Sequence, residues 1–586
     1  MNHPLRLLAL FTLLGATLLR ASEFNVRDHG ATGDGKTLDS PAINKAIEAA
    51  AAAGGGTVLF PAGSYLSFSV RLKSNITLHF APGATRVAAP ASAELGGYDA
   101  PEPNEWGDKQ YQDFGHSHWH NSLIWGEDLV NVSIIGSGLI DGTHGLQRNV
   151  NGPGGRGGRG GRGGGAAAPG ASAPAPTTPA TPPPVVGNKA IALKNCRNVI
   201  IRDISILMGG HFALLATGVD NLTLDNIKVD TNRDGFDIDA CRQVRVSNCS
   251  VNAPHDDAIV LKSSYALGEA RPCENITITN CQVTGFDAGS FLDGTYKRTL
   301  ERAPDRDGPT GRIKFGTESN GGFKNITISN CVFDRSRGLA LESVDGGPIE
   351  DITISNITMR DISNAPIFIR LGARQRGPEG IPVAVIRRIN ISNVVVSGAD
   401  PRYPSIIAGL PGHPIEDVRL SNIRVVSKGG LTMDQISKQP PELANNFFQR
   451  AGARGGPNGT GAPGGAQAAQ APVAGEAGTH RDPYDVPERE NGYPEPSMFG
   501  LLPAYGLFVR HAANITVERF EASVLKPDER PAVVLMDVAN VEFDRVKAQR
   551  PANGPLFVLH NVRNFSTRAV AGIADLQREH AERETL

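Results

Sequence analysis

The residues of this sequence best suited to chemistry are aspartates crowded into one strand-forming stretch. Asp234, Asp256 and Asp257 lie in VDTNRDGFDIDACRQVRVSNCSVNAPHDDAIVLKSS, which spans residues 229–264. The 22-residue offset between Asp234 and Asp256 matches the interval between neighbouring repeats of the chain. If each repeat forms one coil, these two aspartates lie at equivalent positions on adjacent coils, about 4.8 Å apart in the stacking direction.

Carboxylates this close cannot all remain ionised at low cost, so at least one of them is expected to have a raised pKa. Glycoside hydrolysis needs that division, because a protonated acid serves the leaving oxygen while a carboxylate activates water or attacks the sugar. Divergence of the side chains would separate the carboxyl groups by about 6.5–9.5 Å, which leaves room for a water. Asp237 and Asp239, in the same stretch, are expected to cap turns or to pair with basic residues.

Internal repeats must position these aspartates. NVIIRDISIL from Asn198, NLTLDNIKVD from Asn221 and QVRVSNCSVN from Gln243 share one pattern, in which apolar and polar residues alternate on both sides of a turn. Period-two alternation indicates strands, and stacked coils would bury the apolar faces that one unit cannot bury alone. The recurring Asn suits a turn, since it tolerates left-handed backbone. The repeats therefore predict an all-β fold, a single-stranded right-handed parallel β-helix.

The chain outside the repeats divides into a few segments. A short helix near Pro41, ended by Gly54–Gly56, is expected to cap the first coil of the solenoid. We expect the β-helix domain to span residues 23–570, with a C-terminal tail over 571–586. Two low-complexity inserts, at 152–185 and 451–480, are expected to be disordered, because they cannot bury enough apolar surface to fold.

The first 22 residues have the features of a signal peptide, with Arg6 followed by an apolar stretch from Leu7 to Leu19. We therefore expect an exported protein, either periplasmic or extracellular. The formal net charge of −2 gives no electrostatic reason to expect nucleic acid or a membrane surface as partner. We expect no zinc site, since CxxC spacing is absent, and we expect no cofactor. The six cysteines are expected to be buried thiols rather than disulfides, and the protein is expected to be a monomer.

The acidic motifs resemble those of a known enzyme family. NRDGFD from Asn232 and HDDAIVLKS from His255 are similar to the two acidic motifs of glycoside hydrolase family 28, the polygalacturonases. FNVRDHGATGDGKTLDSPAINKAI from Phe24 resembles the start of the wider pectate-lyase-like superfamily. GTESNGGFKNITISNC from Gly316 is similar to a segment of bacterial exo-acting members. The resemblance covers nearly the whole chain outside the signal peptide and the inserts.

This resemblance implies a secreted, inverting hydrolase of galacturonate-containing pectic polysaccharide, exo-acting or directed at rhamnogalacturonan, without a metal. It assigns the general acid to Asp256 and the positioning and activation of water to Asp234 and Asp257. Further residues are expected to bind the substrate and its carboxylate, namely Lys262, Arg312, Lys314 and Glu318.

The sequence departs from the family pattern at two points. Thr310 stands where the family's Gly-His-Gly motif would place its histidine. An Arg-x-Lys triplet, Arg312 to Lys314, comes before GTESNGG, whereas the following coil, where the family's triplet is expected, reads GLALES with Ala340 and Glu342. Either Arg312 and Lys314 have taken over the binding of the substrate carboxylate, or the protein binds a different sugar.

Two other functions remain open at this stage. A calcium-dependent polysaccharide lyase would use the aspartates as ligands and Arg312 or Lys314 as the base. A non-catalytic glycan-binding β-helix would use the same surface without cleaving its ligand. Products that absorb in the ultraviolet and sensitivity to a chelator would indicate the lyase, whereas the binding protein would never release reducing ends.

Overall fold

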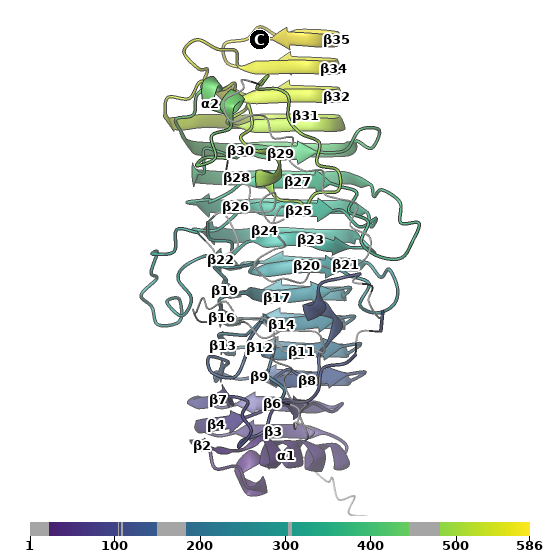
Figure 1. The fold of residues 1–586 in the computed structure, drawn as a ribbon, viewed down its shortest axis with the longest axis vertical. Helices are drawn as coiled ribbons and strands as arrows, with labels where there is room; N and C mark the ends of the chain where they lie inside the picture. The colour runs from purple at the N-terminus through teal and green to yellow at the C-terminus, as the bar shows by residue number, and fades with distance from the viewer. Residues whose placement is uncertain are drawn as a thin grey trace, which may run out of the picture.

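The computed structural model describes residues 23–148 except 104, 107, 108 and 110, together with residues 183–302, 308–444 and 481–586. The predicted parallel β-helix is confirmed: Figure 1 shows one long stack of coils that begins at helix α1 (Ser40–Ala52) and ends at strand β35 (Leu576–Thr585). The expected signal peptide lies outside the described residues, as does nearly all of both expected inserts. No helix in the described part of the chain is long and apolar enough to cross a membrane.

Each coil contributes strands to three parallel rows, in which a strand pairs with its counterparts on the coils before and after it. The first row consists of β1 (Glu23–Asn25), β3 (Gly56–Phe60), β6 (Ile76–Phe80), β9 (Val130–Ile135), β12 (Arg197–Arg202), β15 (Asp220–Asp225), β18 (Arg242–Ser247), β21 (Cys273–Thr279), β24 (Phe323–Asp334), β26 (Ile349–Arg360), β28 (Ile386–Ala399) and β30 (Ile415–Gly429). The second row consists of β2 (Asp34–Leu38), β4 (Gly63–Ser67), β7 (Ala84–Ala88), β10 (Leu139–Asp141), β13 (Ser205–Leu207), β16 (Lys228–Asp230), β19 (Ser250–Asn252) and β22 (Gln282–Thr284).

The third row carries the candidate chemistry, and we call it row three. It consists of β5 (Val70–Arg71), β8 (Ile124–Glu127), β11 (Ile191–Lys194), β14 (Phe212–Thr217), β17 (Asp234–Asp239), β20 (Ile259–Ser263), β23 (Ile313–Ser319), β25 (Leu339–Ser343), β27 (Ile367–Leu371) and β29 (Ser405–Ala408). In the last coils, longer strands bend from this row into the first, namely β31 (Leu507–Lys526), β32 (Val533–Asp544) and β34 (Phe557–Arg568), with β33 (Lys547–Ala548) beside β31. The remaining helices are short: η1 (Val26–His29), η2 (Phe114–Ser117), α2 (Met433–Lys438) and η3 (Pro496–Phe499).

The core follows from the period-two alternation of the repeats. Val199, Leu222, Val244 and Ile276 occupy one register position on four successive coils, and none is more than 1 % exposed. Stacking of identical positions buries the apolar face of every coil and pairs its backbone with both neighbours. All six cysteines are buried free thiols, which confirms that prediction.

Both ends of the stack are covered. The apolar face of α1 lies against the first coils, with Ile43 and Ile47 fully buried, as expected for a capping helix. At the other end, β35 pairs antiparallel with β34. The segment 571–586, expected to be a tail, therefore carries a strand that covers the last parallel strand, because an uncovered edge would invite pairing with another chain.

The recurring asparagines form ladders along the turns. Asn131, Asn198 and Asn221 each have a φ between +55° and +58°, in the left-handed region. The Asn221 amide donates to the Asn198 side chain at 2.9 Å, and the Asn198 amide donates to Asn131 at the same distance. The predicted turn role is confirmed, and each Asn also links its coil to the preceding one.

We predict that Asn221→Ala lowers the melting temperature more than Asn221→Gly. Both variants lose the ladder hydrogen bonds, which contribute about 1 kcal/mol, but only Ala adds the cost of left-handed backbone, about 1–2 kcal/mol. Differential scanning fluorimetry of the two variants measures the difference. Equal melting temperatures would show that the turn conformation does not constrain the residue type.

Candidate active site

The three aspartates lie at one edge of row three, where strands begin. Asp234 opens β17, and Asp256 and Asp257 lie in the turn just before β20. The ladder pairs Phe236 with Ile259, so the offset here is 23 residues rather than the expected 22. Asp257, not Asp256, therefore continues the register of Asp234. The coil from Asp234 to Asp257 is one residue longer than the coil before it, in which Phe212 pairs with Asp234.

The aspartate side chains converge rather than diverge. One carboxylate oxygen from each of Asp234, Asp256 and Asp257 lies within 4.8 Å of the other two. This is closer than the separation of about 6.5–9.5 Å that we expected for an inverting pair. All three side chains are buried, and none is more than 5 % exposed. The acid trio, as we call these three residues, is thus a compact group below the surface.

Burial and mutual repulsion set the proton affinity of the acid trio. Burial raises the pKa of Asp234 to about 8, and the nearby Asp256 carboxylate contributes in the same direction. The prediction that at least one carboxyl group would have a raised pKa is confirmed. At neutral pH the acid trio therefore retains a proton, which belongs to the coupled group rather than to one residue alone.

Basic side chains contact the other two aspartates. Arg233 donates to Asp256. On the far side, Arg312 Nε donates to Asp257 Oδ1 at 2.8 Å, and Lys314 Nζ lies 3.4 Å from Asp257 Oδ2. The site thus keeps a protonated carboxyl group beside carboxylates that face cations.

Arg312 and Lys314 are engaged by further carboxylates. Glu342 lies on the next strand, β25, where its oxygens are 3.8 Å from Arg312 and 3.4 Å from Lys314. Glu495, from the segment just before η3, lies 3.0 Å from Arg312 and 2.7 Å from Arg337. Arg312 and Lys314 are each only 1 % exposed. The structure therefore brings both expected substrate-binding cations to the acid trio, but against protein carboxylates.

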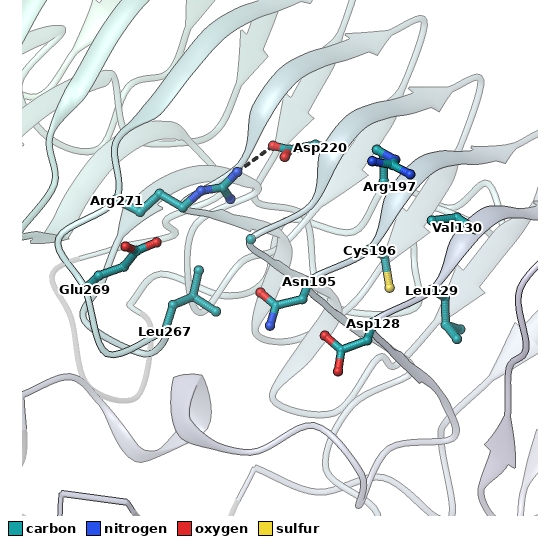
Figure 2. Close-up of a pocket in the computed structure, with 11 residues that line it drawn as sticks. Asp128, Leu129, Val130, Asn195, Cys196, Arg197, Asp220, Leu267, Glu269 and Arg271 are labelled. Carbon is teal, nitrogen blue, oxygen red and sulfur yellow. Dashed lines mark hydrogen bonds and ion pairs between the residues drawn. The ribbon is translucent and has the colours of Figure 1, made fainter.

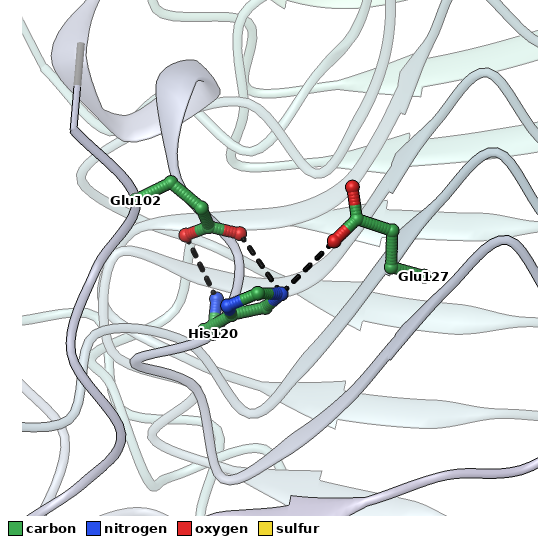
Figure 3. A group of neighbouring side chains, drawn as sticks. All are labelled: Glu102, His120 and Glu127. Carbon is green, nitrogen blue, oxygen red and sulfur yellow. Dashed lines mark hydrogen bonds and ion pairs between the residues drawn. The ribbon is translucent and has the colours of Figure 1, made fainter.

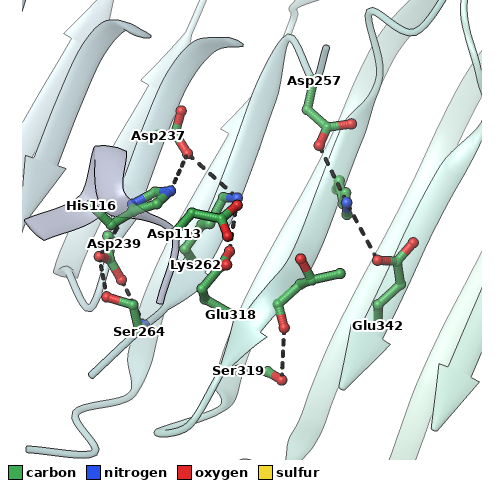
Figure 4. Close-up of polar contacts among 12 residues, drawn as sticks. Asp113, His116, Asp237, Asp239, Asp257, Lys262, Ser264, Glu318, Ser319 and Glu342 are labelled. Atoms are coloured by element: carbon green, nitrogen blue, oxygen red, sulfur yellow. Dashed lines mark hydrogen bonds and ion pairs between the residues drawn. The ribbon is translucent and has the colours of Figure 1, made fainter. Parts of the chain in front are cut away.

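Lys262 and Glu318, also expected to bind substrate, form a second buried network (Figure 4). Lys262 Nζ lies 3.0 Å from Glu318 and 3.9 Å from Asp237. The Glu318 side chain is fully buried and also accepts from Arg376, so it has no surface on which to meet a sugar. Its expected substrate contact is not supported by this placement, because β23 directs it into the ion-pair network.

The two remaining aspartates of the stretch differ from each other. Asp239 accepts hydrogen bonds from the Ser264 N–H and hydroxyl at 2.8 and 2.6 Å, which fits its expected structural role. Asp237 faces Lys262 and His116, whose Nε2 lies 3.7 Å away. Burial, and secondarily Asp234, raise the pKa of Asp237 well above its ordinary value. Asp237 thus extends the electrostatic coupling of the acid trio along β17.

Several residues of the site were not found by sequence reasoning. His116 and Asp113 come from the loop that contains η2, Arg376 comes from the loop after β27, and Glu495 from the segment before η3. Arg376 joins Asp113, 263 residues away, to Glu318. None of these residues belongs to a repeat or an acidic motif, so the sequence offered no signal for them.

Two other polar features involve none of the acid trio. In Figure 3, His120 Nε2 lies between two carboxylates, 3.3 Å from Glu102 and 3.0 Å from Glu127. In Figure 2, an open pocket of about 480 Å³ lies beside the turn from β8 to β9, lined in part by Arg271 and Asp220, which pair at 2.6 Å. None of the residues that line this pocket belongs to the acid trio.

Comparisons with known proteins agree with this geometry. The family model described as rhamnogalacturonase A/epimerase, pectate lyase-like, matches residues 23–148, and that of the right-handed β-helix region matches residues 186–302. A probable polygalacturonase of Vitis vinifera is 23 % identical over 430 residues, covering 69 % of this chain and 74 % of that protein. A polygalacturonase of Cochliobolus carbonum is 26 % identical over 198 residues, covering 32 % of this chain and 46 % of that protein.

A solved structure supports the same fold. The family 28 exopolygalacturonase of Yersinia enterocolitica superposes with a TM-score of 0.56 at 17 % identity, covering 90 % of this chain and 79 % of that one. The chain shares the parallel β-helix fold of that exopolygalacturonase. Within this fold, the acid trio lies in the segments that carry the NRDGFD and HDDAIVLKS motifs.

The raised pKa of Asp234 predicts how stability depends on pH. The folded chain holds a proton on this group up to about pH 8, whereas the unfolded chain releases it near pH 4. Because the folded state binds more protons in this window, its stability falls as the pH rises from about 4 to about 8. We predict that the melting temperature of Asp234→Asn declines less steeply over this window than that of the unmodified protein. Parallel slopes would contradict the assignment of the raised pKa.

Proposed function

We propose that this protein is a glycoside hydrolase that cleaves galacturonate-containing pectic polysaccharide. The convergence of three buried carboxylates, one of which keeps its proton at neutral pH, carries this proposal. Hydrolysis of a glycosidic bond needs a proton donor and a carboxylate within reach of one sugar ring. The names of the polygalacturonase relatives supply the substrate class.

The roles within the acid trio follow from the contacts of each side chain and from the family resemblance. Asp256 is the general acid, and it draws on the proton that the cluster shares with Asp234. Asp257 faces Arg312 and Lys314, which suits a carboxylate that stays negatively charged while it activates water. Asp234 helps to position that water. Inversion of configuration is assigned from the family resemblance, since the close spacing of the oxygens does not itself favour it.

Action on chain ends is supported by the segments that cover row three. The loop with Asp113 and the loop with Arg376 are joined by an ion pair of 2.9 Å, although they come from coils far apart. Together with the near-complete burial of the acid trio, this bridge favours a closed site over an open groove. We further propose export to the periplasm or the cell exterior, where pectic polymers are met, on the basis of the N-terminal sequence.

Loss of a single carboxylate should abolish most of the activity. We predict that Asp234→Asn, Asp256→Asn and Asp257→Asn each lower kcat on pectic oligomers by about 10²- to 10⁴-fold, since general acid and base catalysis contribute that much. Asp528→Asn is the matched control. The Asp528 carboxylate is fully buried and pairs with Arg530, and both residues lie on coils distant from the acid trio. Activity is measured as the release of reducing ends, and the melting temperature of each variant is measured to check that it folds. Full activity in all three variants would refute the assigned site.

The same assay separates hydrolysis from the two rival functions. The oxygens of the acid trio are close enough to bind one cation together, so a calcium-dependent lyase is the rival enzyme to test. A lyase would release products with a new double bond that absorb in the ultraviolet, and a chelator would abolish its activity. We expect neither result, and we expect saturated products whose size shows exo or endo action. A glycan-binding protein would release no products at all.

A further inference from the structure

The positive charge around the acid trio is already matched by protein carboxylates. Three cations contact the trio, namely Arg233, Arg312 and Lys314. Arg233 pairs with Asp256, while Arg312 and Lys314 sit between Asp257 on one side and Glu342 on the other. These contacts all lie within the described residues, and they leave each cation facing at least one anion of the protein.

The pairing of β23 with β25 places Glu342 next to Arg312 and Lys314. Lys314 on β23 pairs in register with Ala340 on β25, so Glu342 follows two positions later on the same outward face. Its side chain is fully buried, and its two oxygens face Arg312 and Lys314 separately. Glu495 adds a second carboxylate against Arg312 from outside the ladder.

These pairings leave no positive charge of the three cations unmatched for a further anion. Burial raises the pKa of Asp234 to about 8 and that of Glu342 to about 7, which shows that a further anion would be poorly tolerated there. A uronate carboxylate at the point of cleavage would have to displace Glu342 or Glu495 from Arg312. A neutral sugar ring would need no such rearrangement.

We propose that the sugar unit bound at the acid trio is uncharged, and that Glu342 excludes uronic acids there by occupying Arg312 and Lys314. This inference rests on the proposed function and deepens it, because the substrate polymer then presents a neutral unit at the cleaved bond. Galacturonate units are bound beside that unit and not at the acid trio. Glu342 acts through the two cations and is a specificity-determining residue rather than a catalytic one.

The test compares two oligosaccharides, homogalacturonan oligomers and rhamnogalacturonan oligomers that end in a neutral sugar. We expect kcat/KM for the neutral-ended oligomers to be at least about tenfold higher, since a tenfold preference corresponds to about 1.4 kcal/mol. Glu342→Gln should lower this preference by about tenfold or more, because it frees Arg312 and Lys314 for a uronate. A wild-type preference for homogalacturonan would overturn the inference.

Two further variants guard against a folding defect. Glu495→Gln removes the second carboxylate at Arg312 and should shift the preference in the same direction. Asp528→Asn removes an equally buried partner of a distant arginine and should leave the preference unchanged. An equal change in all three variants would show a general loss of stability and would count against the inference.

A binding measurement separates failure of this inference from failure of the proposed function. Saturation-transfer NMR with Asp256→Asn would compare L-rhamnose with D-galacturonate as free monosaccharides. If Asp256→Asn binds L-rhamnose preferentially but the unmodified protein cleaves no oligomer, the hydrolase proposal is refuted and the inference is retained. Preferential binding of D-galacturonate would overturn the inference even if the protein proves to be a hydrolase.

Discussion

The hydrogen-bonded register between successive coils is the constraint on which the rest of this structure depends. Once β17, β20, β23 and β25 are paired, alternate residues must face inward or outward together. Phe236, Ile259, Ile313 and Leu339 then fill the core, while the residues between them form the outer face of row three. Asp237, Lys314 and Glu342, which are far apart in the sequence, are directed to that face by this alternation. Asp234 and Asp257 instead lie where β17 and β20 begin. A one-residue slip would exchange the two sets.

That outer face concentrates charge where water has little access, which is costly unless each group finds a partner. The structure meets this cost by alternating signs. Asp257 in the turn before β20, Lys314 on β23 and Glu342 on β25 follow one another, and Lys262 lies between Asp237 and Glu318. The compensation is incomplete at Asp234 and Asp237, whose pKa values are raised. Unfavourable burial at these two residues keeps a proton in the site near neutral pH, at a cost in stability.

The sequence predicted the features that the repeat dictates and missed those that it does not. Stacked coils, the capping helix, the asparagine turns and the grouping of Asp234 with Asp256 and Asp257 all follow from local periodicity. The register error of one residue arose because the length of a turn cannot be read from the strands that flank it. The contact of Glu318 with Arg376 was missed for a related reason, since Arg376 comes from a loop with no repeat pattern. Contacts of this kind depend on tertiary packing, which single-sequence periodicity does not encode.

The paired strands position the residues of this site, and the loops cover them. The ladder fixes Arg312, Lys314 and Glu342 rigidly, as a precise site requires, but on its own it would form an exposed face along the whole solenoid. Closure comes from outside the ladder, because Arg312 meets Glu495, 183 residues further along the chain, and Asp113 meets Arg376 across row three. Such long-range bridges enclose only the coils between them. The position of the bridges, rather than the strands, thus determines which stretch of a uniform β-helix is covered.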